Sequence, residues 1–160
     1  KNIIIIMEGG IIYLGGEMIV SALSYGLVSV AISDTSHSIL NILKGAVFDS
    51  DEYPGLTKFL EKLDIKNTIK ITETIINDIS ETLQKINSVH LGLESVLEII
   101  KKIKQEFDNI EKEIDYHKKE RYWAEYRTPH YYSYLKQIEE LQKILNIRVK
   151  LLIDILKLQK

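Results

Sequence analysis

The sequence predicts an all-α protein, a helical bundle in which a long amphipathic helix folds back on a C-terminal helix. Apolar residues recur every three or four positions over most of the chain, which is typical of helices with one buried face. Proline occurs only twice in 160 residues, so helices can run without interruption. Hydrophobic residues make up 45% and charged residues 28%, as in a folded globular domain. We therefore expect a single domain over residues 1–160, with an apolar head over 1–63 and a helical hairpin over 64–160.

The head begins with an apolar segment that glycine pairs interrupt at positions 9–10 and 15–16. After them the pattern predicts a helix that continues to about residue 33. Small residues recur along one face of this helix at spacings of three or four or at twice that spacing, which predicts close packing against another helix or within a membrane. That face consists of Gly15, Ala22, Gly26 and Ser29.

Two short helices are predicted in the rest of the head. Residues 34–36 are good helix-capping residues, so they predict a break, followed by a short helix over about 36–44 that Gly45 ends. Pro54 then suits the first turn of a further helix, which we expect over about 55–63.

The segment from residue 9 to 33 is long enough to cross a bilayer, and Glu17 is its one charged residue. Its aliphatic residues favour insertion by roughly 3–5 kcal/mol, whereas a central acidic residue costs about 3 kcal/mol. Polar and small residues add nothing favourable, so we prefer a helix buried against protein. The layout of an apolar head followed by long helices resembles that of α-helical pore-forming toxins. This resemblance implies the alternative, a membrane-active protein that anchors or forms a pore by inserting residues 9–33.

The strongest periodicity lies between residues 65 and 126, where one heptad register holds for seven heptads. The a positions are Thr72, Ile79, Ile86, Leu93, Ile100, Phe107 and Ile114, and the d positions are Ile75, Thr82, Val89, Val96, Ile103, Ile110 and His117. The e position is also apolar or His up to Leu97 and then becomes Lys104, so the stripe narrows near Leu97. The register predicts one long helix over about 65–126.

Thr128 and Pro129 supply an N-cap and a first-turn proline, so they predict a second helix over about 129–158. Folded back antiparallel, that helix spans roughly 45 Å and reaches to about Leu97. Its last part, 144–158, is apolar on nearly all sides, which predicts that it is enclosed between neighbours. One chain of this size is short of residues to cover both this helix and the broad stripe, so we expect self-association.

Aromatic and basic residues gather around the predicted hairpin turn. Residues 115–134 hold six of the nine tyrosines and the only tryptophan. Such residues anchor protein interfaces, stack nucleic-acid bases, or pack across a turn as a structural cap. The candidate interface residues are Tyr122, Trp123, Tyr126, Arg127, Tyr131 and Tyr132.

The sequence contains no motif for catalysis or cofactor binding. It lacks cysteine, which excludes disulfides and thiolate metal sites, and its net charge of −2 argues against a nucleic-acid partner. His90 and His117 lie near the helical seam and are interpreted as packing residues, and the acidic loop 49–52 lacks the spacing of a calcium loop. We therefore predict a non-enzymatic assembly or interaction protein without cofactor or metal. Its expected partner is a protein or a second copy, or lipid in the alternative, and its expected location is cytoplasmic or particle-associated.

Overall fold

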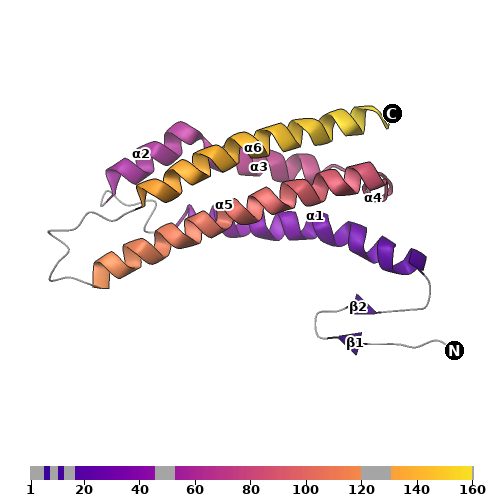
Figure 1. Cartoon of the computed structure of the whole chain (residues 1–160), viewed down its shortest axis with the longest axis horizontal. Helices are drawn as coiled ribbons and strands as arrows, with labels where there is room; N and C mark the ends of the chain where they lie inside the picture. The colour runs from indigo at the N-terminus through magenta and orange to yellow at the C-terminus, as the bar shows by residue number, and fades with distance from the viewer. Residues whose placement is uncertain (1–5, 8–10, 13–16, 46–52, 120–130, 160) are drawn as a thin grey trace.

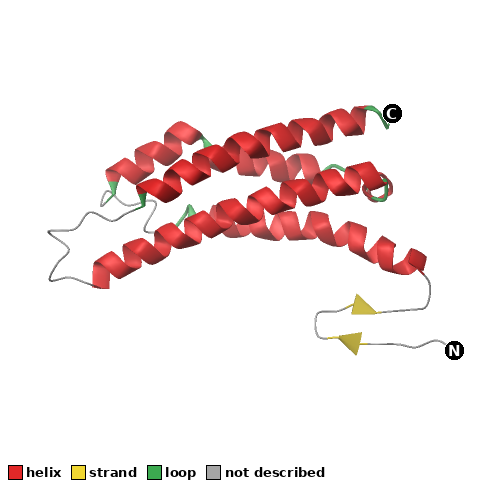
Figure 2. Cartoon of the chain, in the orientation of Figure 1, coloured by secondary structure: helices red, strands yellow, loops and turns green. Residues whose placement is uncertain are grey.

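The computed structural model describes the backbone of residues 6–7, 11–12, 17–45, 53–119 and 131–159, and within these ranges the side chains from residue 26 onward. It confirms the predicted helical bundle (Figure 1). The elements are β1 (Ile6–Met7), β2 (Ile11–Ile12), α1 (Glu17–Ile42), α2 (Pro54–Leu63), α3 (Ile65–Asn77), α4 (Glu81–Gln84), α5 (Asn87–Lys119) and α6 (Tyr132–Lys157). The two short strands pair antiparallel, and Figure 2 shows that helices form nearly all the remaining described structure.

Four helices pack in a ring, in which α1 contacts α3 and α5, and α6 contacts α5 and α3. In Figure 1, α6, α5 and α1 lie side by side, with α3 behind them. The α5–α6 pair is antiparallel, because Gly92 abuts Leu152 whereas Ser95 accepts a hydrogen bond from Arg148 three residues further along α5. The predicted hairpin is therefore confirmed, and its expected turn at residues 127–129 lies outside the described residues.

The predicted single helix over 65–126 is divided. A helix begins at Ile65 as expected, but this helix, α3, ends at Asn77, and the long helix α5 begins at Asn87. The chain reverses between α3 and α5 through the short helix α4, and α3 runs antiparallel to α5 (Figure 1). Ser80 begins α4, where its Oγ accepts a hydrogen bond from the Leu83 N–H at 3.4 Å. Gln84 Nε2 donates to the Ile79 carbonyl at 2.9 Å and thereby closes the turn.

The α2–α3 corner follows the predicted end of the second short helix, and α2 confirms the helix expected over 55–63. Asp64 takes a left-handed conformation with φ of 52°, and its carboxylate accepts a hydrogen bond from Asn67. Gln142 on α6 donates to the Leu63 carbonyl at 2.7 Å and to Thr68 Oγ1 at 2.9 Å. A buried amide thus fixes the corner against α6.

The predicted break at residues 34–36 is wrong, because α1 continues from Glu17 to Ile42. Thr35 Oγ1 donates to the Ala31 carbonyl at 2.7 Å, so the hydroxyl bonds within the helix and does not cap a new one. Ile32 and Ile39 on the same helix are fully buried. Burial of this face outweighs the weak helix propensity of the Asp-Thr-Ser segment.

The heptad register is confirmed along α5, where every a and d position from Val89 to Ile114 is buried. These residues are Val89, Leu93, Val96, Ile100, Ile103, Phe107, Ile110 and Ile114. The core continues across the hairpin into Leu135, Ile138, Leu145 and Leu152 of α6.

The coverage of α5 by α6 differs from the expected 97–126. Leu152 lies next to Gly92, so the last turns of α6 pack against the first turns of α5. The coverage therefore extends further toward the start of α5 than Leu97. The expectation that 144–158 is enclosed is also wrong for a single chain, because Ile147 is 67% exposed and Leu151 is 58% exposed.

Alanine substitutions at two neighbouring residues, Ile100 and Lys101, test the heptad register of α5. Ile100→Ala leaves a cavity in the core and lowers the free energy of unfolding by about 2–5 kcal/mol. Lys101→Ala removes an exposed side chain and changes it by about 0.5 kcal/mol or less. Urea denaturation followed by circular dichroism gives both values. Equal, small effects would contradict the register.

Gly92 and Gly26 test the closeness of helix packing. A Cβ atom at Gly92 would lie 2.9 Å from Leu152 Cδ1, so Gly92→Leu forces α5 and α6 apart and destabilises the protein by about 1–3 kcal/mol. A Cβ atom at Gly26 meets nothing within 4 Å, so Gly26→Leu gains helix propensity and stabilises by up to about 1 kcal/mol. Thermal melts compare the two, and a higher melting temperature for the Gly92 variant would contradict the described crossing.

Candidate functional site

The outward side of α6 presents four large aliphatic side chains. Ile144, Ile147, Leu151 and Leu158 are exposed by 39%, 67%, 58% and 83%. Their spacings of three, four and seven residues place them on one side of the helix, opposite the buried core positions of α6. We call this set the outer face of α6.

Single exposed aliphatic residues are ordinary on protein surfaces, but a row of them on one helix face forms a patch. Each such side chain gains about 1.5–3 kcal/mol when it is moved fully from water into an apolar environment. The outer face of α6 is therefore a surface whose burial would be favourable.

Two ion pairs on α6 lie on either side of Ile147 and Leu151 in the sequence. Lys143 Nζ lies 2.8 Å from Glu140 Oε1, and Lys157 Nζ lies 2.9 Å from Asp154 Oδ1. The hydrogen bond that Lys143 donates to Glu140 raises the pKa of Lys143, and the one that Lys157 donates to Asp154 lowers the pKa of Asp154. The two ion pairs give the patch a polar rim.

Arg148 holds α6 to α5 beside this face. Its Nη1 donates to the Ser95 carbonyl at 2.6 Å and to Glu98 Oε2 at 2.8 Å, and Lys102 Nζ lies 2.6 Å from the other Glu98 oxygen. The hydrogen bond from Arg148, with help from Lys102, lowers the pKa of Glu98 to about 2. The outer face is therefore carried on a helix whose position is fixed.

The aromatic residues predicted as an interface are only partly described. Tyr131 is buried, meets Tyr53 edge-on with centroids 6.2 Å apart, and stacks on Tyr132 at 4.9 Å. Lys118 Nζ lies 5.8 Å from the centre of the Tyr53 ring, and the absence of a side chain at Gly55 leaves room for the Tyr132 hydroxyl. Tyr131 thus packs α2 against the start of α6, while Tyr132 is exposed.

The other predicted interface residues, Tyr122, Trp123, Tyr126 and Arg127, lie outside the described residues. The small-residue face is likewise described only in part, since Gly15 and the side chain of Ala22 fall outside it. At Gly26 no neighbouring atom comes close, and Ser29 Oγ lies 3.0 Å from both the Gly26 carbonyl and Gln84 Oε1. A close approach between helices does occur on α5 at Gly92, where no sequence signal beyond the glycine itself marked it.

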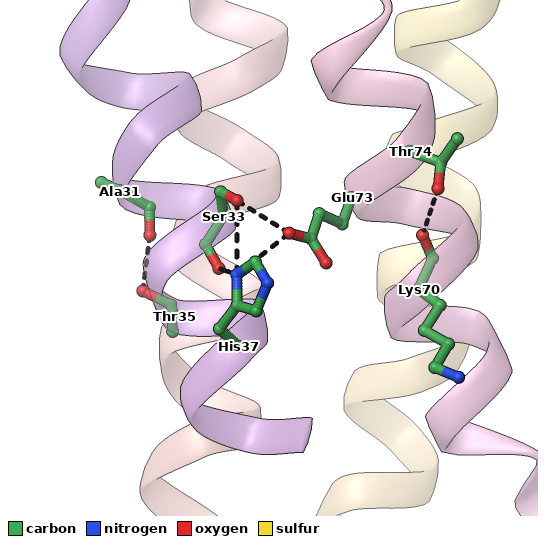
Figure 3. A network of polar contacts seen from close by, with 7 residues as sticks. All are labelled: Ala31, Ser33, Thr35, His37, Lys70, Glu73 and Thr74. Atoms are coloured by element: carbon green, nitrogen blue, oxygen red, sulfur yellow. Dashed lines mark hydrogen bonds and ion pairs between the residues drawn. The ribbon is translucent and has the colours of Figure 1, made fainter. Parts of the chain in front are cut away.

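A polar cluster joins α1 to α3 (Figure 3). Ser33 Oγ donates to Glu73 Oε1 at 2.7 Å, and His37 Nδ1 lies 3.1 Å from the same oxygen and 3.0 Å from the Ser33 carbonyl. Because both of these neighbours are acceptors, Nδ1 carries the hydrogen. Glu73 is mostly buried, so the two donors compensate the loss of its hydration.

The same cluster is not arranged for nucleophilic catalysis. In a Ser–His–acid triad, one imidazole nitrogen takes the hydroxyl proton while the other donates to the carboxylate. Here Ser33 and Glu73 both lie on the Nδ1 side of His37, and the hydroxyl donates directly to the carboxylate. The cluster therefore links two helices.

Within the described ranges, no three His, Asp or Glu side chains gather as metal ligands. His90 Nε2 lies 3.4 Å from Glu94 Oε1 on the same helix, in keeping with a packing role at the seam. Among the described helices, none has the length and apolar character needed to cross a bilayer. Comparison of the chain with protein-family models, with curated proteins and with solved structures finds no match.

The burial of Tyr131 makes the stability of the protein depend on pH. Burial raises the pKa of Tyr131 above its usual value of 10.0, and the neighbouring Tyr132 and Tyr53 raise it further. The unfolded chain therefore ionises first, so this contribution to stability is complete below pH 10 and is lost as the pH rises through the higher folded-state value.

We expect Tyr131→Phe to lose less stability than the wild type when the pH is raised above about 10. Urea denaturation at a series of alkaline pH values measures the slope. Tyr116→Phe is the control, because it removes the same hydroxyl from an exposed ring. Parallel slopes for Tyr131→Phe and the wild type would contradict the packing of Tyr131.

Proposed function

We propose that this protein is a non-enzymatic helical assembly protein, a subunit that associates through the outer face of α6. The observation that carries the proposal is the exposure of Ile147 and Leu151 on a helix whose opposite side is buried in the core. A helix that is apolar on both sides is typical of a position between two packed layers. One layer is the ring of helices in this chain.

The surroundings of the outer face support an interface. Protein interfaces combine an apolar centre with a charged or polar rim. Here the centre is aliphatic, and the rim consists of the Glu140–Lys143 and Asp154–Lys157 pairs. Arg148 fixes the helix to α5, so association would order little additional structure.

The proposal is tested by the mass of the protein in solution without detergent. Sedimentation equilibrium should give a multiple of the chain mass for the wild type. The double variant Ile147→Glu with Leu151→Glu should give the mass of one chain, because association would bury two unpaired charges. Its melting temperature at low protein concentration should stay close to that of the wild type, since both residues are exposed.

Val30→Glu is the matched control. Val30 is 55% exposed on α1, and its replacement puts a glutamate on an exposed apolar position away from α6. This variant should assemble like the wild type. A wild type of single-chain mass at every concentration, or assembly that survives the double variant, would contradict the proposal.

Liposome flotation separates the proposal from the membrane-active alternative. An assembly protein should stay with the soluble fraction at high salt, where electrostatic binding to lipid is screened. Flotation of the wild type under these conditions would favour insertion through residues 9–33.

A further inference from the structure

We propose that the partner at the outer face of α6 is a second copy of this chain, packed antiparallel with a two-fold axis near residue 149. Ile147 then lies opposite Leu151 of the second copy, and Leu151 lies opposite Ile147. This inference rests on the proposed function and adds the identity, direction and register of the partner.

The order of charges along α6 selects the antiparallel direction. An acidic residue precedes a basic one on both sides of Ile147 and Leu151, as Glu140–Lys143 and as Asp154–Lys157. When a copy is turned end over end, Lys143 comes opposite Asp154, and Glu140 comes opposite Lys157. Each end therefore meets its opposite charge.

The charged and apolar pairings agree on one register. The midpoint between positions 143 and 154 is the same as that between positions 140 and 157, and it lies within half a residue of the midpoint between 147 and 151. A single alignment thus brings both the Ile147–Leu151 contact and the four charges into register. A two-fold interface requires such self-complementarity, since each surface must fit its own copy.

A parallel pairing lacks this complementarity. It would place Lys143 opposite Lys143 and Asp154 opposite Asp154, so like charges would face one another along the rim. The side chains of these two residues are 58% and 51% exposed, so they are accessible to a partner. Lys143 and Asp154 can therefore exchange their ion pairs within one α6 helix for ion pairs between the α6 helices of two copies.

The first experiment reverses the charges on the full-length chain. Lys143→Asp alone and Asp154→Lys alone each place like charges together twice in the dimer. Each should weaken dimerisation about tenfold at low salt, measured by sedimentation equilibrium. The double variant restores opposite charges and should regain the wild-type dissociation constant. Lys66→Asp, an equal charge change at an exposed position of α3, should have little effect.

The second experiment uses the absence of cysteine in the chain. Positions 143 and 154 are eleven residues apart, about 16 Å along one helix. In the proposed dimer they lie opposite each other, so the variant with both Lys143→Cys and Asp154→Cys should form covalent dimers with a short bismaleimide linker. Either single variant should not, because its two copies of the same position lie about as far apart.

The outcomes separate this inference from the proposed function. Recovery by the charge-reversed double variant, together with cross-linking that needs both cysteines, supports the antiparallel dimer. Cross-linking of the single variants, or no recovery while the double variant Ile147→Glu with Leu151→Glu still abolishes assembly, overturns the register and leaves the proposed function intact. A wild type of single-chain mass overturns both. Thermal melts of all variants verify that each one folds.

Discussion

The continuous apolar seam of α5 is the constraint on which the other elements depend. From Val89 to Ile114 every a and d side chain is buried, which requires neighbours along nearly the whole described helix. Helices α6 and α1 supply them from two sides, and α3 closes the ring between them without extensive contact with α5. The hairpin partner α6 runs antiparallel to α5, and α1, which comes from the opposite end of the chain, runs parallel to it (Figure 1). Burial of the α5 seam therefore depends on both helices.

Buried amides at the helix corners make this arrangement specific. Gln84 closes the α3–α4 turn by donating to the Ile79 carbonyl and accepts from Ser29 on α1. Gln142 donates to the Leu63 carbonyl where α2 ends, and so joins that corner to α6. Helix ends leave carbonyl groups without partners, and a buried carbonyl without one costs about 1–3 kcal/mol. Side chains from neighbouring helices meet this need, so the positions of the corners and of the helices are coupled.

The sequence predicted what depends on periodic burial and missed what depends on how the chain turns. The register of α5 was correct because its apolar stripe faces one core throughout. The reversal near Ser80 was hidden because Thr72, Ile79 and Ile86 keep heptad spacing across it, although Asp78 before a serine N-cap was a local signal. At Thr35 the error was the opposite, because a break was predicted where the helix continues. A hydroxyl suited to capping can instead bond within a buried helix. The apolar character of 144–158 was evident, but the side that stays exposed depends on the alignment of α6 with α5, which periodicity does not specify.

The exposed side of α6 differs from that of α5 in a way that the fold of one chain does not explain. On α5 the residues facing water include the charged Glu94, Glu98 and Lys101, and its exposed apolar residues, Leu91 and Tyr116, lie far apart on the helix. On α6 the corresponding side carries Ile147 and Leu151, which add nothing to the core of the monomer and favour association with other apolar surfaces. Polar residues there would serve the monomer equally well. The proposed dimer would account for both the apolar outer face and the order of the charges around Ile147 and Leu151, because α6 would then lie between two layers of helices.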